Sequence, residues 1–216
     1  MNSIIKSFNK IQSNIDKVKT KKKVNIVAIS KTFPISHIKP LIDHGHSHFG
    51  ENKVQEALSK WGDLKKDNQD LKLHMVGKLQ SNKAKDAAKI FDYIHSLDTQ
   101  KLADIFSNYE KNNDKSLKYF IQVNIGNENQ KSGIPANELE PFFNYCTKEN
   151  NLEIVGLMII PPNDGNPIKY FKNINELNTS LGLTELSMGM SADYTAAVSN
   201  GATFVRVGSL IFGERS

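Results

Sequence analysis

The chain has only one cysteine, Cys146, among 216 residues. A single thiol can form neither an internal disulfide nor a zinc site built from several cysteines. The sequence therefore excludes a secreted disulfide scaffold, and it favours a reducing, cytoplasmic compartment. Cys146 lies among aromatic residues in a stretch with helical spacing, so we expect it to be packed in the core rather than nucleophilic.

Long apolar runs are also missing. The longest candidates are segments 155–162 and 204–212, and Arg206 interrupts the second. Neither approaches the roughly 20 residues that a helix needs to cross a bilayer. We therefore expect no membrane-spanning segment and no membrane partner.

Arginine is nearly absent, since only Arg206 and Arg215 stand among 28 basic residues. The net charge of +5 and the pI of about 9.1 would by themselves allow nucleic-acid binding. Specific recognition of phosphates and bases relies on the planar guanidinium group, however, and the remaining basic residues here are lysines. We expect no nucleic-acid partner.

Several short catalytic motifs are absent: H-E-x-x-H, G-x-S-x-G, the Walker loop and G-x-G-x-x-G. An alternative is a metallohydrolase, because His44, His46 and His48 alternate and could project metal ligands from one strand face. The other strand ends carry no matching Asp or His, and His44 is expected in the preceding helix. We therefore expect no metal site.

The first twenty residues carry apolar side chains at steps of three and four, which predicts an amphipathic helix over 1–20. A lysine-rich, acid-poor helix resembles an organelle transit peptide, but this one lacks arginine and runs directly into a strand-like segment. We interpret it as a helix that packs on the mature fold.

Beyond this helix, short apolar segments alternate with segments of helical spacing, and no linker or composition shift divides the chain. About eight β/α units predict a single (β/α)8 TIM barrel domain over residues 1–216, an α/β fold. The predicted strands are 24–31, 46–50, 73–77, 93–97, 119–125, 154–160, 185–188 and 204–207. The predicted helices are 38–44, 54–60, 83–90, 102–111, 138–150, 168–181 and 194–200.

The carboxyl ends of barrel strands carry the chemistry in this fold, and Lys31 ends the first predicted strand. A lysine held there can form a Schiff base, because burial favours the neutral amine that attacks a carbonyl. The alternative is a lysine that marks where the strand meets solvent.

The loops after strands seven and eight form the place where barrels often hold a phosphate. In the first loop we expect Ser191 to cap a helix that begins near residue 192, with backbone N–H groups that favour an anion. In the second, Gly208 allows close approach of the backbone and Ser209 offers a hydroxyl. An ordinary helix cap is the alternative role for Ser191.

Arg206 lies between two valines, and strand alternation can turn its side chain into the barrel, where an unpaired charge is costly. It should therefore have a partner. That partner is either a structural salt bridge or a cofactor's ring nitrogen or phosphate.

The sequence resembles the pyridoxal 5′-phosphate (PLP) homeostasis proteins, the YggS/PROSC family of PLP-binding proteins, over nearly its whole length. The motifs that carry the resemblance are AISKT at 28–32, FGEN at 49–52, HMVG at 74–77, LQSNK at 79–83, KSG at 131–133, GLM at 156–158, SMGMS at 187–191, VRVGS at 205–209 and IFG at 211–213.

The resemblance implies a fold-type III PLP-binding barrel like the N-terminal domain of alanine racemase, with PLP as a Schiff base on Lys31. It implies that Arg206 faces the pyridine nitrogen and that the two loops hold the phosphate. The cofactor-binding residues carried over in this way are Lys31, Asn52, Ser191, Arg206, Gly208 and Ser209.

An arginine at the ring nitrogen discourages protonation of the pyridine and weakens the ring as an electron sink. The sequence also ends at Ser216, so we expect no second domain to supply a second catalytic base. We therefore expect intracellular PLP homeostasis, by binding, buffering or transfer, rather than efficient turnover. PLP-dependent apoenzymes are candidate partners, a monomer is expected, and a racemase-like enzyme of low activity remains the alternative.

Overall fold

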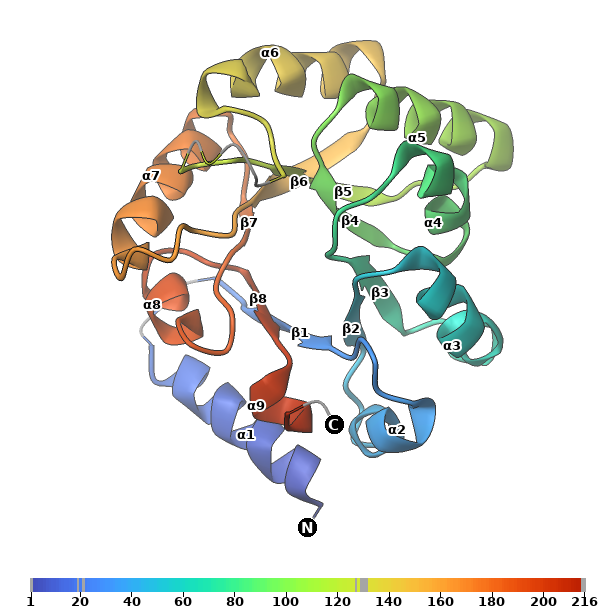
Figure 1. Cartoon of the computed structure of the whole chain (residues 1–216), viewed down its shortest axis with the longest axis vertical. Helices are drawn as coiled ribbons and strands as arrows, with labels where there is room; N and C mark the ends of the chain where they lie inside the picture. The colour runs from blue at the N-terminus through green and yellow to red at the C-terminus, as the bar shows by residue number, and fades with distance from the viewer. Residues whose placement is uncertain (1, 19, 21, 127, 129–131, 215–216) are drawn as a thin grey trace.

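The computed structural model describes residues 2–18, 20, 22–126, 128 and 132–214. Eight parallel strands close into a barrel in their order along the chain, so that β1 pairs with both β2 and β8 (Figure 1). The predicted (β/α)8 fold is thus confirmed. The strands are β1 Asn25–Ile29, β2 His48–Glu51, β3 Lys72–Met75, β4 Tyr93–Leu97, β5 Lys118–Gln122, β6 Glu153–Met158, β7 Glu185–Ser187 and β8 Phe204–Val207.

Helices surround the ring of strands and cover its outer face (Figure 1). They are α1 Ser3–Asp16, α2 Ile35–Asp43, α3 Val54–Asp67, α4 Ala84–Ile90, α5 Gln100–Asn113, α6 Leu139–Asn144, α7 Pro167–Ser180, α8 Tyr194–Ser199 and α9 Ser209–Phe212, with short turns η1 Ser81–Lys83, η2 Ala136–Glu138 and η3 Tyr145–Glu149. The aliphatic and aromatic side chains between the strands and the helices form the main core.

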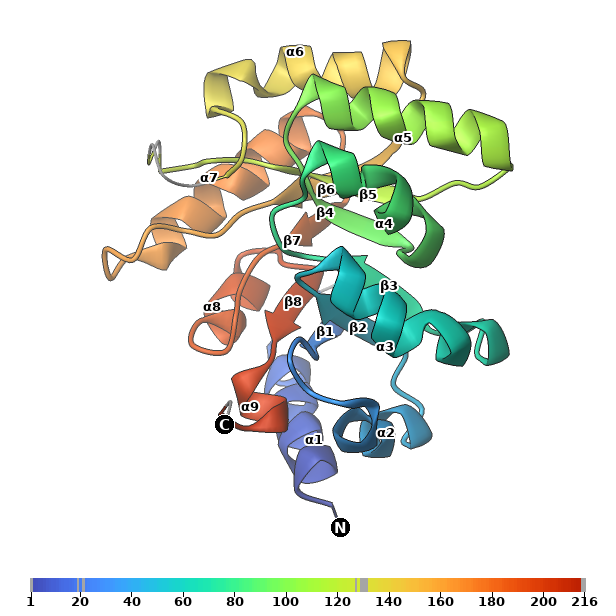
Figure 2. The ribbon, with the colours of Figure 1, turned by 45° about the vertical axis from the view of Figure 1, so that its right-hand side comes forward.

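Helix α1 is the amphipathic helix predicted over 1–20, and it ends at Asp16. It begins after Asn2, whose side-chain oxygen accepts a hydrogen bond from the backbone N–H of Ile4. Its buried stripe is Ile4, Ile11 and Ile15. The helix packs against α2, α8 and α9, next to the wall formed by β1 and β8 (Figure 2).

Most predicted boundaries shift by one to four residues, and three differences matter. Strand β1 ends at Ile29, so Lys31 lies in the following turn and not on the strand. The helix predicted over 138–150 is divided into α6 and the π-helical segment η3, in which Cys146 packs into the core. Helix α9 after β8 was not predicted.

The inside of the barrel has an apolar layer and a polar one. Val27, Phe120, Met158 and Phe204 fill the apolar layer. Strand alternation places a series of polar side chains beside them, among which His74, His95 and Ser187 are fully buried. A polar barrel interior of this kind requires every group to have a hydrogen-bonding partner.

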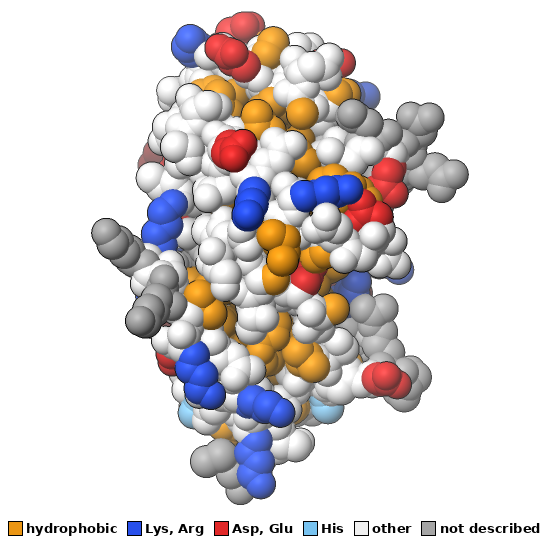
Figure 3. All heavy atoms as spheres, turned by 90° about the vertical axis from the view of Figure 1, so that its left-hand side faces the viewer, with side chains coloured by type: hydrophobic (Ala, Val, Ile, Leu, Met, Phe, Trp, Pro, Cys, Tyr) orange, Lys and Arg blue, Asp and Glu red, His pale blue; other side chains and the backbone are white. Residues whose placement is uncertain are grey.

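Figure 3 shows that the Lys and Arg side chains on one face are spread among acidic, hydrophobic and uncharged atoms. Within the described residues, no helix is both long and apolar enough to cross a membrane.

The histidines of the barrel predict how the stability of the fold depends on pH. Burial lowers the pKa of His46 and of His48 from 6.5 to about 4, and nearby Lys23 and Lys72 also lower that of His48. Burial also holds the pKa of His74 well below its usual range. These groups bind protons more weakly in the folded chain than in the unfolded chain, so acid favours unfolding.

We therefore expect the free energy of unfolding, measured by urea titration, to fall as the pH drops from 6.5 towards 4, by an amount on the order of a few kcal/mol. His46→Gln should make that fall shallower, whereas His44→Gln, at an exposed position, should leave it unchanged. A stability that stays flat across this pH window would contradict the assignment of neutral histidines.

Candidate functional site

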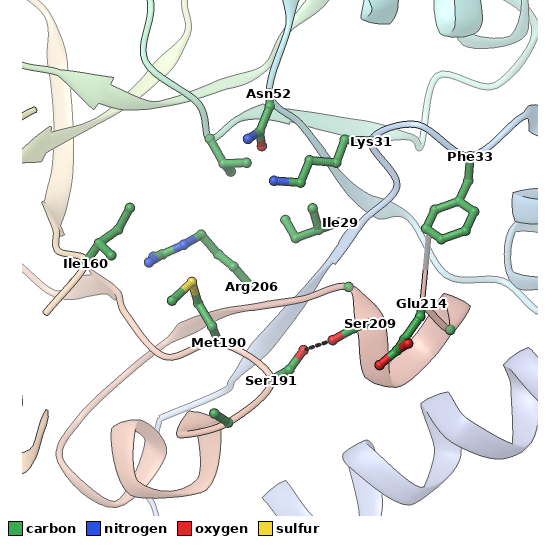
Figure 4. Close-up of a pocket in the computed structure, with 14 residues that line it drawn as sticks. Ile29, Lys31, Phe33, Asn52, Ile160, Met190, Ser191, Arg206, Ser209 and Glu214 are labelled. Atoms are coloured by element: carbon green, nitrogen blue, oxygen red, sulfur yellow. Dashed lines mark hydrogen bonds between the residues drawn. The ribbon is translucent and has the colours of Figure 1, made fainter. Parts of the chain in front are cut away.

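A cavity of about 590 Å³ opens at the carboxyl ends of the strands, where Lys31, Asn52 and Arg206 point towards a common space (Figure 4). The cavity brings together all six residues that the sequence singled out. Among the described residues, its lining is Ile29, Lys31, Phe33, Asn52, Val76, Ile160, Met190, Ser191, Ala192, Arg206, Gly208, Ser209, Gly213 and Glu214.

Lys31 enters the cavity from a turn that α3 holds in place. The next residue, Thr32, has φ of 70°, a conformation that costs a β-branched residue roughly 1–3 kcal/mol. Its backbone N–H donates to Glu56 Oε1 at 2.5 Å, and Lys60 Nζ donates to the carbonyl oxygen of Ser30 at 2.9 Å. Two side chains of α3 therefore fix the backbone on either side of Lys31.

A buried carboxylate supports the same turn. Glu51 is fully buried, and its Oε1 accepts hydrogen bonds from Ser30 Oγ at 2.7 Å, Lys60 Nζ at 2.9 Å and Trp61 Nε1 at 3.0 Å. Lys60 also bonds Glu56 Oε1 at 2.9 Å. This network joins the end of β1, the end of β2 and helix α3, and the sequence patterns did not reveal it.

Arg206 lies on the inward face of β8, as strand alternation predicted, and is 5% exposed. One terminal nitrogen donates to Ser187 Oγ at 2.6 Å and the other to the carbonyl oxygen of Ile159 at 2.8 Å. No carboxylate in the described part of the chain forms an ion pair with it. The salt-bridge alternative is therefore not what the structure shows, and burial lowers the pKa of Arg206 to about 10.

Ser191 and Ser209 come from different loops and meet at the rim of the cavity, where the Ser209 hydroxyl donates to Ser191 Oγ at 3.1 Å (Figure 4). The prediction that Ser191 caps a helix is wrong. Helix α8 begins at Tyr194 with Asp193 as its N-cap. Asp193 Oδ1 accepts the N–H of Met190 at 2.6 Å, and this bond closes a turn that leaves Ser191 facing the cavity.

Three glycines allow close packing or a turn beside the cavity, and one of them, Gly208, lines it. Gly77 packs against the backbone of Asn52, because a Cβ atom at this position would lie 2.4 Å from the Asn52 carbonyl oxygen. Gly189 has φ of 89°, a left-handed conformation that bends the chain after β7. Gly208 follows β8 and packs beside Ile29, where an added Cβ would come within 3.2 Å.

The sequence reasoning missed the apolar and acidic parts of the lining. Ile160 and Met190 are 37% and 40% exposed, and they follow β6 and β7. The rule that strand ends face the site could have found both. Phe33 and Glu214 lie further from a strand end, and nothing in their local sequence indicated the cavity.

The alternating histidines do not converge on one point. His44 Nε2 contacts Asn9, His46 Nε2 bonds the carbonyl oxygen of His48, and His48 Nδ1 bonds His74. No group of three or more candidate metal ligands occurs among the described residues.

Cys146 is fully buried, and burial raises its thiol pKa to about 12. Lys131 of the KSG motif lies outside the described residues.

Comparisons with known proteins agree with the architecture. The family described as alanine racemase, N-terminal domain, matches residues 7–216. The alanine racemase of Clostridium difficile 630 has a TM-score of 0.74 over 99% of this chain and 57% of its own, at 12% identity, which is a likeness of fold alone. The fold and the family match therefore define a barrel of the alanine racemase N-terminal domain class.

Proteins named pyridoxal phosphate homeostasis protein are similar over the full length. That of Vibrio cholerae is 36% identical over 100% of this chain and 98% of its own, and that of Escherichia coli K12 is 32% identical over the same shares. PipY of Synechococcus elongatus PCC7942, solved without and with PLP, has TM-scores of 0.87 and 0.86 at 34% identity, over 97% of this chain and 100% of its own. The chain belongs to the pyridoxal phosphate homeostasis protein family.

The network behind Lys31 predicts an unequal effect of two lysine substitutions on α3. Lys60→Met leaves the buried Glu51 carboxylate without its cation and should cost about 3–5 kcal/mol in the free energy of unfolding. Lys66→Met breaks only the pair with Asp63, whose side chains are 76% and 98% exposed, and should leave the urea midpoint unchanged. Equal effects of the two substitutions would contradict this account of the network.

Proposed function

We propose that this protein binds PLP in the cavity at the barrel mouth, with a covalent link to Lys31, and that it buffers or transfers the cofactor inside the cell. The observation that carries the proposal is that Lys31 lines the same cavity as Arg206, a buried cation that has no ion-pair partner in the described residues. The names of the relatives and the PLP bound in PipY support it.

The residues of the cavity suit this ligand by charge and by chemistry. PLP supplies an aldehyde that bonds to an amine and a pyridine ring that withdraws electrons. Lys31 supplies the amine, and its turn is anchored by α3. Arg206 would supply a donor for the ring nitrogen, while Ser191, Gly208 and Ser209 line the rim where the phosphate would bind. Asn52 lies beside Lys31 (Figure 4).

Arg206 also favours binding over turnover. A guanidinium group keeps its proton at neutral pH, and it donates a hydrogen bond without passing on the proton. Arg206 therefore leaves the ring nitrogen of the cofactor unprotonated and weakens its electron-withdrawing power. A cytoplasmic monomer that holds PLP and passes it to PLP-dependent apoenzymes fits this property.

The attachment site is tested by fixing the cofactor to the protein. Purified protein mixed with PLP should develop a visible absorption band, and borohydride reduction followed by peptide mass mapping should place the cofactor on Lys31. Lys31→Ala should lose both the band and the labelled peptide. Lys53→Ala, at an exposed position outside the cavity lining, serves as the control and should keep both. Absence of label from the wild type would overturn the proposal.

The phosphate end is tested by removing the two rim hydroxyls. A hydrogen bond to a charged group contributes about 1.5–3 kcal/mol, so Ser191→Ala and Ser209→Ala should each raise the Kd for PLP by roughly 10-fold or more. Pyridoxal, which lacks the phosphate, should bind both variants and the wild type alike. Ser199→Ala, whose hydroxyl bonds a carbonyl oxygen within α8, should leave the Kd for PLP unchanged. Equal losses for PLP and pyridoxal would place the phosphate elsewhere.

A further inference from the structure

Four polar side chains form a continuous hydrogen-bonded column across the barrel interior, ending on Arg206. His48 Nδ1 lies 2.9 Å from His74 Nε2, His74 Nδ1 lies 2.9 Å from His95 Nε2, and His95 Nδ1 lies 2.7 Å from Ser187 Oγ. Ser187 Oγ in turn accepts a hydrogen bond from Arg206 at 2.6 Å. The column therefore links the start of β2 to the floor of the cavity through β3, β4 and β7.

The column is shielded from water and its rings are held in place. His74, His95 and Ser187 are fully buried, and only His48 is partly exposed. His74 stacks on Tyr93 with ring centroids 4.4 Å apart, and His95 stacks on Phe120 at the same distance. Burial lowers the pKa values of His48, His74 and His95, and the charge of Arg206 adds to the shift at His95, so these three imidazoles are neutral at pH 7.

Arg206 gives the column a direction. A guanidinium group donates hydrogen bonds and accepts none, so Ser187 Oγ must be the acceptor in that contact. The hydroxyl hydrogen of Ser187 has one remaining partner among the described residues, His95 Nδ1. If His95 donated instead, Ser187 would hold a buried hydrogen without an acceptor, at a cost of about 1–3 kcal/mol. His95 Nδ1 is therefore the acceptor.

The direction then passes from ring to ring. A neutral imidazole carries one N–H and one bare nitrogen, so His95 must hold its proton on Nε2 and donate it to His74 Nδ1. His74 must likewise hold its proton on Nε2 and donate it to His48 Nδ1. His48 accepts on Nδ1 and therefore carries its own proton on Nε2, at the partly exposed end of the column.

We propose that Ser187, His95, His74 and His48 are positioning residues for Arg206, which together form a one-directional column that holds the guanidinium group at the floor of the cavity. The bonds to Ser187 and to the Ile159 carbonyl oxygen use two of the five guanidinium N–H groups and fix its plane. The consequence for the cofactor rests on the proposed function, since the ring nitrogen of PLP would meet a donor whose orientation the column sets.

The tautomers are measured in protein without cofactor. Long-range ¹H–¹⁵N correlation spectra of ¹⁵N-histidine-labelled protein at neutral pH distinguish a protonated Nε2 from a protonated Nδ1. Assignment by single His→Gln variants should give the Nε2–H tautomer for His48, His74 and His95. An Nδ1–H tautomer or a positively charged ring at His74 or His95 would overturn the proposal, and this measurement needs no variant at Ser187.

Variants at Ser187 test whether the hydroxyl sets the direction. Ser187→Ala removes the donor to His95 Nδ1 and should shift the His95 nitrogen signals towards a mixture of tautomers, whereas Ser187→Thr retains a hydroxyl and should restore the single tautomer. Ser96→Ala is a matched control, because Ser96 is also buried, lies on β4 and has no hydrogen bond through its Oγ in the described residues. It should leave the spectrum unchanged. Unchanged His95 signals in Ser187→Ala would contradict the proposal.

Loaded protein then tests the link to Arg206. Ser187→Ala should shift the cofactor's visible absorption maximum and its pH dependence while the cofactor still maps to Lys31, and Ser96→Ala should do neither. If the wild type shows the expected tautomers but binds no PLP, the proposed function fails and the column stands. If PLP maps to Lys31 but the Ser187→Ala spectrum matches that of the wild type, the positioning role fails and the proposed function stands.

Discussion

The site depends on one buried cation, the Arg206 guanidinium group, that the barrel holds without a carboxylate partner among the described residues. Transfer of a charge from water into a protein interior is costly unless polar groups replace the water. Here a hydroxyl and a backbone carbonyl oxygen accept two of its hydrogen bonds, and the open cavity lies on its other side. The charge of Arg206 therefore makes the cavity receptive to a ligand with an acceptor atom or a negative charge.

The second requirement is a fixed position for Lys31, and the strain nearby shows how it is met. The left-handed conformation of Thr32 is tolerated because Glu56 binds its N–H, and Lys60 binds both that carboxylate and the carbonyl oxygen of Ser30. The buried Glu51 carboxylate holds Lys60 in turn. The turn is thus set by α3 before any ligand binds, which reduces the ordering cost of binding.

The sequence predicted the features that follow from periodicity. Strand alternation indicated that Arg206 faces inward, and the bounds of β4 and β8 match the prediction, because buried β-branched and aromatic residues define both strands. Prediction from the sequence failed where hydrogen bonds determine where a helix begins. Ser191 looks like a helix cap, but Asp193 binds the N–H of Met190 and moves the helix start to Tyr194.

The histidine column could not be predicted either. It depends on which residues of β2, β3, β4 and β7 face inward at the same level, and the contact between His95 and Ser187 joins residues 92 positions apart. A sequence pattern carries no information on that register. The same holds for Glu51, which looks like an ordinary polar residue at the end of β2 until the fold places Lys60 and Trp61 beside it.

The most direct test of this account is a crystal structure of the protein grown with PLP. We expect electron density continuous from Lys31 Nζ into the cofactor, the pyridine nitrogen within hydrogen-bond distance of Arg206, and the phosphate between the loops of Ser191 and Ser209. A cofactor bound with its phosphate against Arg206, or one that leaves Lys31 unmodified, would contradict it.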